Sequence, residues 1–265
     1  QGRFSFIDAL DVDHLDGSCW LSAGRDGLFR IDASGEVQPL SAAPLVLPGA
    51  LALDSANGLG WVVDRGTQDV FWFSLDEHSD GRLAVVGVDA RFSDPAVLAA
   101  ADGACWILDR QAGRALRYRS ADRSRTEWTD LEDPLVLAAS SDDVAWLLDA
   151  GGTRLLRIAG EGQTTDIELP FAAAVALDVD RETGACWVVG SGDLAAFGND
   201  GSMVFHRRLA DGAVGISVDE AHGKVWILSS LELWKVSTEG EILSQLAGFS
   251  AARHVAVHPR NSERN

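Results

Sequence analysis

The chain has 265 residues and carries 22 Lys and Arg against 40 Asp and Glu, which gives a formal net charge of −18. Nucleic acid and anionic membrane surfaces are disfavoured as partners, because both are bound through clustered cations and the basic residues here are mostly scattered singly. The hydrophobic content of 46% suffices for a large core, and no run approaches the roughly 18 apolar residues that cross a bilayer, so we expect a globular chain without membrane insertion.

Tryptophan recurs along the chain at a near-constant spacing. Six of the nine Trp residues follow one another at intervals of 39 to 45 positions. A period of about 40 residues is typical of solenoids and propellers. The residue three positions before the Trp is Gly in five of these repeats and Asp143 in the other. The repeats are centred on Trp20, Trp61, Trp106, Trp146, Trp187 and Trp226.

Each repeat contains four predicted short strands in chain order. The first is small and apolar, a turn with Gly follows, the second contains the Trp, the third alternates apolar and polar residues, and a second Gly turn leads to the fourth. Strands of these types are predicted at 9–13, 28–31, 50–53, 61–63, 106–108, 136–139, 155–158, 175–177, 233–236 and 241–246. No repeat has helical periodicity, so the sequence predicts an all-β, six-bladed β-propeller of four-stranded antiparallel blades.

The repeated Trp is expected to pack between blades. Successive side chains of a strand point to opposite faces, and both faces of a blade are covered by neighbouring blades, so a large aromatic at one fixed place favours packing over ligand binding. Cys19, Cys105 and Cys186 precede the Trp in alternate repeats. A whole blade would separate them, which exceeds the roughly 7 Å limit for a disulfide. We expect free thiols that fill space between blades.

The two ends leave the number of blades open. Residues 9–13 before Trp20 match residues 176–180 before Trp187, so the N-terminal segment supplies a first strand. Residues 254–259 also resemble a first strand. We expect six blades in one domain over residues 1–259 with a tail at 260–265; seven blades, the last incomplete, are the alternative.

The order of residues within each repeat resembles the NHL-type propeller repeat. A Pro leads into the first strand, and small apolar residues, a Gly turn, an aromatic strand, an Asp and an Arg-containing third strand follow. Repeat four, with residues 146–149 followed by 154–158, is most similar to it. WD and kelch repeats fit less well, because no Trp-Asp dipeptide occurs and a Gly pair occurs only at 151–152. The Pro residues are Pro48, Pro95, Pro134 and Pro170.

Three carboxylates are expected on one face of consecutive blades. Asp64, Asp109 and Asp149 lie three residues after the Trp, and Arg65 and Arg110 follow two of them. Three carboxylates around a channel could hold Ca²⁺, the one cofactor considered. The favoured interpretation is that each Asp caps the backbone N–H groups of its turn, since this Asp is typical of the NHL-type repeat.

An enzyme is not favoured. Lactonase relatives of this fold, resembling gluconolactonase and regucalcin, hold a metal with a Glu, two Asn and an Asp, but the four Asn here are predicted in turns of the opposite face (Asn57, Asn199) or in the tail (Asn261, Asn265). Streptogramin-lyase relatives rely on His residues that face the channel. The His residues here are predicted in opposite-face turns (His14, His78, His222), in a fourth strand (His206) or in the ambiguous last strand (His254, His258). No Gly-x-Ser-x-Gly, Walker or His-Glu-x-x-His motif occurs.

A binding surface remains as the leading interpretation. The links that precede first strands contain Arg91, Phe92, Asp94 and Phe171, and exposed Arg and aromatic residues are common interface anchors. We therefore expect a non-enzymatic binding or scaffold propeller that contacts a protein partner or another domain of the same chain. A propeller that binds carbohydrate or a small molecule is the first alternative, and a metal-dependent hydrolase or lyase the second. The family resemblance implies an extracellular or periplasmic location.

Overall fold

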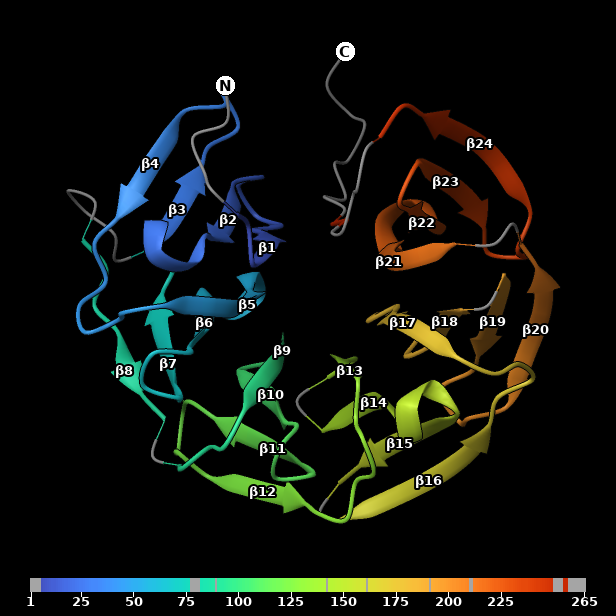
Figure 1. Ribbon diagram of the computed structural model, residues 1–265, viewed down its shortest axis with the longest axis horizontal. Coiled ribbons are helices and arrows are strands. Elements are labelled where there is room, and N and C mark those ends of the chain that lie inside the picture. The colour runs from blue at the N-terminus through green and yellow to red at the C-terminus, as the bar shows by residue number, and fades with distance from the viewer. Residues whose placement is uncertain are drawn as a thin grey trace. The chain divides into compact units, whose positions relative to one another are not determined.

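The computed structural model describes residues 6–76, 82–88, 90–141, 143–160, 162–190, 192–209, 212–249 and 255–256. In these ranges the chain forms six sheets, each of four strands in sequential antiparallel order (Figure 1). The fold is therefore an all-β, six-bladed β-propeller, as the Trp period predicts. Helical structure in the described ranges is limited to single 3₁₀ turns, and no helix there is long and apolar enough to cross a membrane.

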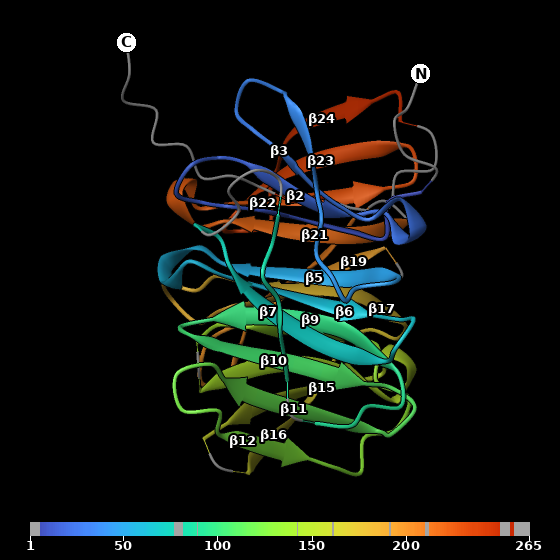
Figure 2. The same cartoon turned by 90° about the vertical axis from the view of Figure 1, so that its left-hand side faces the viewer.

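The chain divides into two compact units, residues 1–130 and 131–265, with three blades in each. In unit 1, blade 1 is β1 (Ala9–Val12), β2 (Cys19–Ser22), β3 (Leu28–Ile31) and β4 (Val37–Leu40). Blade 2 is β5 (Pro48–Asp54), β6 (Leu59–Asp64), β7 (Asp69–Ser74) and β8 (Val86–Gly87). Blade 3 is β9 (Pro95–Ala101), β10 (Ala104–Asp109), β11 (Arg114–Arg119) and β12 (Arg125–Trp128). Figure 2 shows the sheets of blades 2 and 3 packed as successive layers.

Unit 2 repeats this arrangement. Blade 4 is β13 (Val136–Ala139), β14 (Val144–Asp149), β15 (Arg154–Ala159) and β16 (Gln163–Glu168). Blade 5 is β17 (Ala174–Val179), β18 (Cys186–Gly190), β19 (Asp193–Phe197) and β20 (Met203–Arg208). Blade 6 is β21 (Ala213–Asp219), β22 (Lys224–Ser229), β23 (Glu232–Ser237) and β24 (Ile242–Ala247). The predicted seventh first strand, 254–259, lies outside the described residues except for Val255 and Ala256, which are not in a strand.

The repeated Trp packs against the following blade. In unit 1, the ring of Trp20 stacks on that of Phe73 in blade 2 at 5.5 Å, and the ring of Trp61 meets Tyr118 of blade 3 edge-on at 5.9 Å. In unit 2, Trp146 shares a buried cluster with residues of blade 5, and Trp187 shares one with residues of blade 6. The prediction of packing between blades is confirmed at these four positions. The Trp of blade 6, at position 226, is only half-buried.

The three cysteines are free thiols, as predicted. Cys105 and Cys186 are fully buried in the clusters that join neighbouring blades, whereas Cys19 is half-buried. Burial raises the pKa of the Cys105 and Cys186 thiols well above the usual range. These two side chains therefore act as small apolar residues that fill space between sheets.

Carboxylates on the first strands also join neighbouring blades, a role that the sequence does not predict. Asp11 of blade 1 accepts a hydrogen bond from the backbone N–H of Leu53 in blade 2 at 2.8 Å. Asp178 of blade 5 accepts one from Val218 in blade 6, also at 2.8 Å. Each carboxylate also accepts from the N–H of its own following residue. The similarity of residues 9–13 and 176–180 thus reflects a shared contact between blades.

Asp178 makes stability depend on pH. Its pKa is raised to about 6, chiefly by burial and also by nearby Glu220, although two backbone N–H groups and Arg181 act to lower it. Between about pH 4 and 6 the folded chain therefore binds a proton that the unfolded chain has lost, so stability falls as pH rises. We expect Asp178→Asn to remove this dependence. From pH 4 to 7 the free energy of unfolding of the variant should gain up to about 3 kcal/mol relative to the wild type.

Urea unfolding followed by circular dichroism across this pH range measures the effect. Glu168→Gln, at an exposed carboxylate on the outer strand β16, is the control and should follow the wild-type profile. Parallel profiles for the wild type and Asp178→Asn would show that Asp178 does not titrate in this window.

Candidate functional site

Asp64 ends β6 and is fully buried. Its carboxylate accepts hydrogen bonds from the backbone N–H groups of Val46 and Leu47 at 2.7 and 2.9 Å, and from Gly66 at 2.8 Å. Val46 and Leu47 belong to the link that leads into β5, whereas Gly66 belongs to the turn that follows Asp64 itself. The carboxylate thus ties the second strand of blade 2 to the link before its first strand.

Asp109 repeats this contact at the end of β10 and adds an ion pair. It accepts from the N–H groups of Ser93 and Asp94, the latter at 2.8 Å, in the link that leads into β9. Its second oxygen lies 3.2 Å from Nε and 3.1 Å from Nη2 of Arg114 on β11. Asp109 is fully buried, so the link, the second strand and the third strand of blade 3 meet at one carboxylate.

Asp149 occupies the same place in blade 4. It accepts from the N–H of Glu132 at 3.2 Å and pairs with Arg154. Its other oxygen, Oδ1, is buried and has no hydrogen-bond partner in the structure. Blade 5 has Gly190 at this position, and a Cβ there would lie 2.3 Å from the backbone oxygen of Ala173, because the link packs directly on the strand.

The three Asp residues therefore cap backbone N–H groups, as the favoured interpretation expects. The capped segment differs from the expectation: it is chiefly the link that precedes the first strand, and only Asp64 also caps its own turn. All oxygens of Asp64 and Asp109 accept hydrogen bonds from protein donors. In the described part of the chain, no group of three or more His, Cys, Asp or Glu residues is placed to hold a metal ion. The geometry thus supports capping over Ca²⁺ binding.

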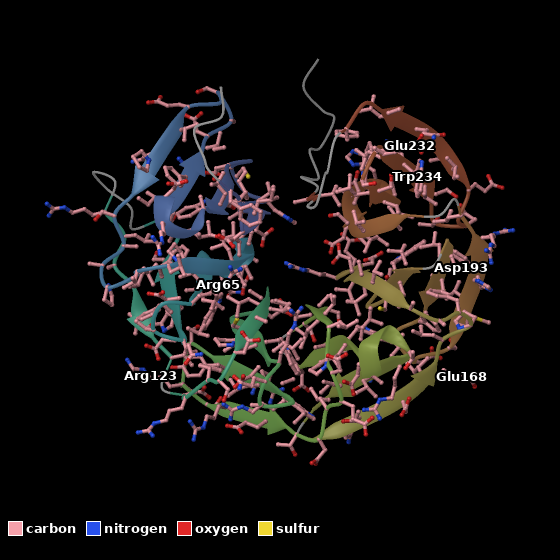
Figure 3. All side chains as sticks on the ribbon, viewed as in Figure 1. Arg65, Arg123, Glu168, Asp193, Glu232 and Trp234 are labelled. Atoms are coloured by element: carbon pink, nitrogen blue, oxygen red, sulfur yellow. The ribbon has the colours of Figure 1, made fainter. Side chains whose placement is uncertain are left out.

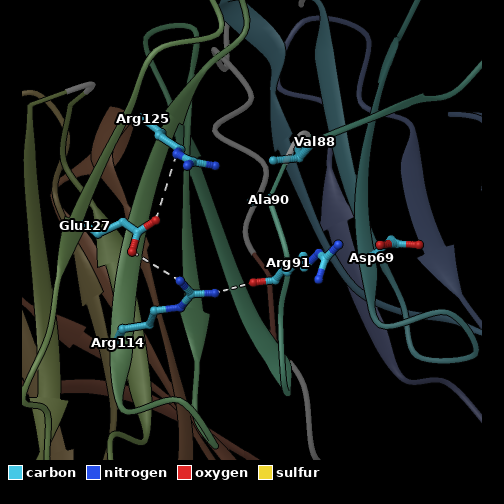
Figure 4. A pocket seen from close by; sticks show the side chains of 7 residues that line it. All are labelled: Asp69, Val88, Ala90, Arg91, Arg114, Arg125 and Glu127. Carbon is cyan, nitrogen blue, oxygen red and sulfur yellow. Dashed lines mark hydrogen bonds and ion pairs between the residues drawn. The ribbon is translucent and has the colours of Figure 1, made fainter.

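A cavity of about 590 Å³ opens in unit 1 beside the link between β8 and β9 (Figure 4). We call it the arginine pocket. Residues of β7, of the segment after β8, and of the two outermost strands of blade 3 surround it. Its lining consists of Asp69, Val88, Ala90, Arg91, Arg114, Arg125 and Glu127.

Arg114, which lines this pocket, is held by several contacts. Besides Asp109, it pairs with Glu127 at 3.1 Å and donates to the backbone oxygen of Arg91. Its guanidinium carbon lies 5.8 Å from the centroid of the Phe92 ring. These contacts fix Arg114 and the adjoining link together. Arg125 lies at the rim, where its Nε is 4.0 Å from Glu127.

The structure brings together only some of the predicted surface residues. Arg91 lines the arginine pocket, whereas Phe92 and Asp109 contact Arg114, another residue of its lining. Arg65, labelled in Figure 3, instead pairs with Asp8 at 2.6 Å, and Arg110 is exposed outside the pocket lining. Phe171 belongs to unit 2, where its ring stacks on that of His206 at 5.8 Å.

Of the seven residues that line the pocket, the sequence predicted only Arg91; four of the six others are charged, namely Asp69, Arg114, Arg125 and Glu127. A signal for the arginines was present. Eight of the 22 basic residues fall between positions 82 and 125. The basic residues are therefore not evenly scattered: blade 3 with its preceding link, residues 82–128, carries eight Arg against six Asp and Glu and is a local region of positive charge in an acidic chain.

The histidines lie where the sequence predicts them, as far as the structure describes them. His14 and His222 are in turns between first and second strands, and His206 is in the fourth strand β20. His206 Nε2 lies 2.8 Å from Asp193 Oδ1. Asn57 and Asn199 are likewise in turns. The remaining predicted positions, His78, His254, His258, Asn261 and Asn265, lie outside the described residues.

Comparisons with known proteins support the propeller fold. No family model matches the sequence, and no curated protein matches it. A streptogramin B lyase structure is similar over 94% of this chain and 85% of its own, with a TM-score of 0.76 and 16% identity. Virginiamycin B lyase from Staphylococcus aureus has a TM-score of 0.72 and 15% identity, over 91% of this chain and 84% of its own.

The WD40 repeats of RRP9 are similar over 98% of this chain and 86% of their own, with a TM-score of 0.79 and 12% identity. At such identities the likeness concerns the propeller fold alone. Lyases and a WD40 propeller share it, so the fold is compatible with a binding scaffold and does not choose between catalysis and binding.

Proposed function

We propose that this chain is a non-enzymatic binding propeller that docks a protein partner, or another domain of the same chain, on the arginine pocket. The observation that carries the proposal is the arginine pocket itself, a cavity of about 590 Å³ in which the exposed side chain of Arg91 adjoins Phe92 and an anchored Arg114. Arginine and aromatic residues are the residue types that dominate binding energy at protein interfaces.

The side chain of Arg114 and the link that adjoins it are also preorganised for binding. Arg114 is fixed by Asp109 and Glu127, so a partner that contacts it does not have to order a freely moving side chain. The link that carries Arg91 and Phe92 is held by the same network through Asp109. A preorganised surface loses less conformational entropy on association.

Exposed apolar residues on unit 2 support a protein partner. The outer strands β20 and β24 expose large hydrophobic side chains, and β24 is exposed along its whole length. The outer strand of blade 4, β16, exposes none. Large apolar side chains exposed on outer strands are available for contact with a partner. The exposed residues are Met203, Val204, Ile242, Leu243 and Leu246.

A small-molecule-binding propeller is the second candidate. The cavity volume of about 590 Å³ favours it, because pockets for small ligands span about 300 to 1,000 Å³. A hydrolase or lyase has less support, since the described residues provide no cluster of metal ligands. The NHL-type resemblance and an extracellular or periplasmic location are part of the proposal, and cell fractionation tests the latter.

Affinity purification from cells of the source organism tests the proposed function. We expect the wild-type protein and Arg123→Glu to retain the same protein, and Arg91→Glu to lose it. Arg123 is an exposed residue in the turn between β11 and β12, outside the pocket lining, and its substitution changes the charge equally (Figure 3).

With the retained protein purified, titration calorimetry should show binding to Arg91→Glu weakened at least about tenfold, or about 1.4 kcal/mol. Unchanged affinity, or failure of the wild-type protein to retain any protein, would refute the proposal. A small molecule that co-purifies with the wild type and not with Arg91→Glu would establish the second candidate instead.

A further inference from the structure

We propose that the arginine pocket receives a single carboxylate, carried on an otherwise apolar segment of the partner, and that Arg91 binds it. This inference rests on the proposed function and specifies the chemistry of the docked segment. The carboxylate is that of an Asp or Glu side chain within the segment, and a carboxylate at a chain end is the alternative that the test excludes.

The charge distribution of the chain favours an anionic group at this place. The net charge of −18 repels anions from most of the surface, but blade 3 with its preceding link, residues 82–128, carries eight Arg against six Asp and Glu. A local positive region in a negative protein directs an anionic group to that region and away from the remaining surface.

Arg91 is the residue able to bind the incoming group. Across the ranges that the structure describes, its guanidinium has neither a hydrogen bond nor an ion pair, and the side chain is exposed at the pocket. Arg114, in contrast, already pairs with Asp109 and Glu127. Figure 4 shows Arg91 on the side of the pocket that faces Asp69, opposite the Arg114–Glu127 pair. A guanidinium matches a carboxylate with two parallel hydrogen bonds.

The other lining residues limit the charge and the surroundings of the ligand. Asp69 and Glu127 place two carboxylates at the pocket, so a dianionic phosphate would meet more repulsion than a monoanion. Val88 and Ala90 provide an apolar wall, with Phe92 next to it beneath Arg114. A run of acidic residues is disfavoured by the same two carboxylates. The fitting segment has one carboxylate among apolar residues.

A random heptapeptide library displayed with its C-terminus blocked, panned on the wild-type protein and on Arg91→Gln, tests the inference. We expect the wild type to enrich sequences with a single Asp or Glu flanked by apolar residues, and Arg91→Gln not to enrich them. Enrichment of sequences without a carboxylate, of the same sequences by Arg91→Gln, or of none would overturn the inference. The partner retained in the affinity purification would still stand, so this failure is distinguishable from failure of the proposed function.

Synthetic versions of the most enriched peptide, amidated at the C-terminus, then give the affinities by calorimetry. Replacing its Glu by Gln should weaken binding at least tenfold to the wild type and leave binding to Arg91→Gln unchanged. Arg123→Gln is the matched control and should bind like the wild type. A version with a free C-terminal carboxylate in place of the side chain should bind at least tenfold more weakly, and equal or tighter binding would refute the side-chain source. Tighter binding of a phosphoserine version would refute a site for a monoanion.

Discussion

Replacing Trp146 by alanine should destabilise the protein by about 3 to 5 kcal/mol, the usual loss when a fully buried aromatic is truncated. Trp146 is fully buried between blades 4 and 5 in unit 2, in a cluster with Leu177, Val179 and Phe197. The truncation would remove contacts on both sheets and leave a cavity that rigid strands cannot fill. Urea unfolding followed by far-ultraviolet circular dichroism measures the free energy of unfolding.

Trp226→Ala is the matched control for this substitution. Trp226 occupies the same position of the repeat, but it is half-buried, and Lys235 Nζ lies 5.2 Å from its ring. Its truncation should cost about 1 to 2 kcal/mol, since less apolar surface leaves water when it folds. Equal losses at the two positions would contradict the conclusion that packing against the following blade, and not the repeat position itself, gives the Trp its effect.

Asp109→Ala should cost about 3 kcal/mol or more, because it breaks a buried ion pair and leaves two backbone N–H groups without an acceptor. These N–H groups belong to Ser93 and Asp94, and the ion pair is with Arg114. Differential scanning calorimetry measures the loss. Asp94→Ala is the control, because Asp94 is exposed and its backbone N–H remains in place.

A second comparison separates the ion pair from the capping hydrogen bonds. Asp64 caps its link in the same way but accepts only from backbone N–H groups. Asparagine keeps one acceptor oxygen and loses the charge, so Asp109→Asn should destabilise more than Asp64→Asn. It should also weaken ligand binding at the arginine pocket, because Arg114 and the link with Arg91 lose their common anchor. Equal losses of stability would show that Arg114 contributes nothing through Asp109.

The blades could be predicted because their packing imposes a period. Sheets that cover each other need a large apolar side chain at the same place in each repeat, and Trp20 against Phe73 is such a contact. The turn before the Trp strand has a Gly with positive φ in five of the six repeats, and this φ is 63° at Gly58. Both requirements recur about every 40 residues, so they are visible in one sequence.

The arginine pocket could not be predicted in the same way, because it is formed by the link between β8 and β9, whose sequence does not recur in the other repeats. The segment from Val88 to Phe92 follows the two-residue strand β8, and its path decides which residues of blade 3 it meets. The strand pattern also leaves open what an Arg of β11 does. Arg117 is buried with its guanidinium 5.7 and 5.8 Å from the rings of Trp106 and Trp128, while Arg114, three residues earlier, lines the pocket.

The sequence predicted that the Asp residues cap backbone N–H groups, but it did not predict which N–H groups they cap. An Asp at the end of a strand indicates a capped backbone, but its donors are separated from it in sequence. Asp109 and Ser93 are 16 residues apart, and Asp64 and Val46 are 18 apart. Only the fold of the link brings these donors to the carboxylate.

The packing of Trp20 and Trp61 on the blades that follow them also bears on synthesis by the ribosome. Trp20 is covered by Phe73 and Trp61 by Tyr118, both more than 50 residues later in the chain. At translation rates of about 5 to 20 residues per second, each new blade would present an uncovered aromatic face for roughly 3 to 10 seconds. A nascent chain of this kind is expected to engage a chaperone in a pulse once per blade, and ribosome profiling of chaperone-bound chains would show those pulses about 40 codons apart.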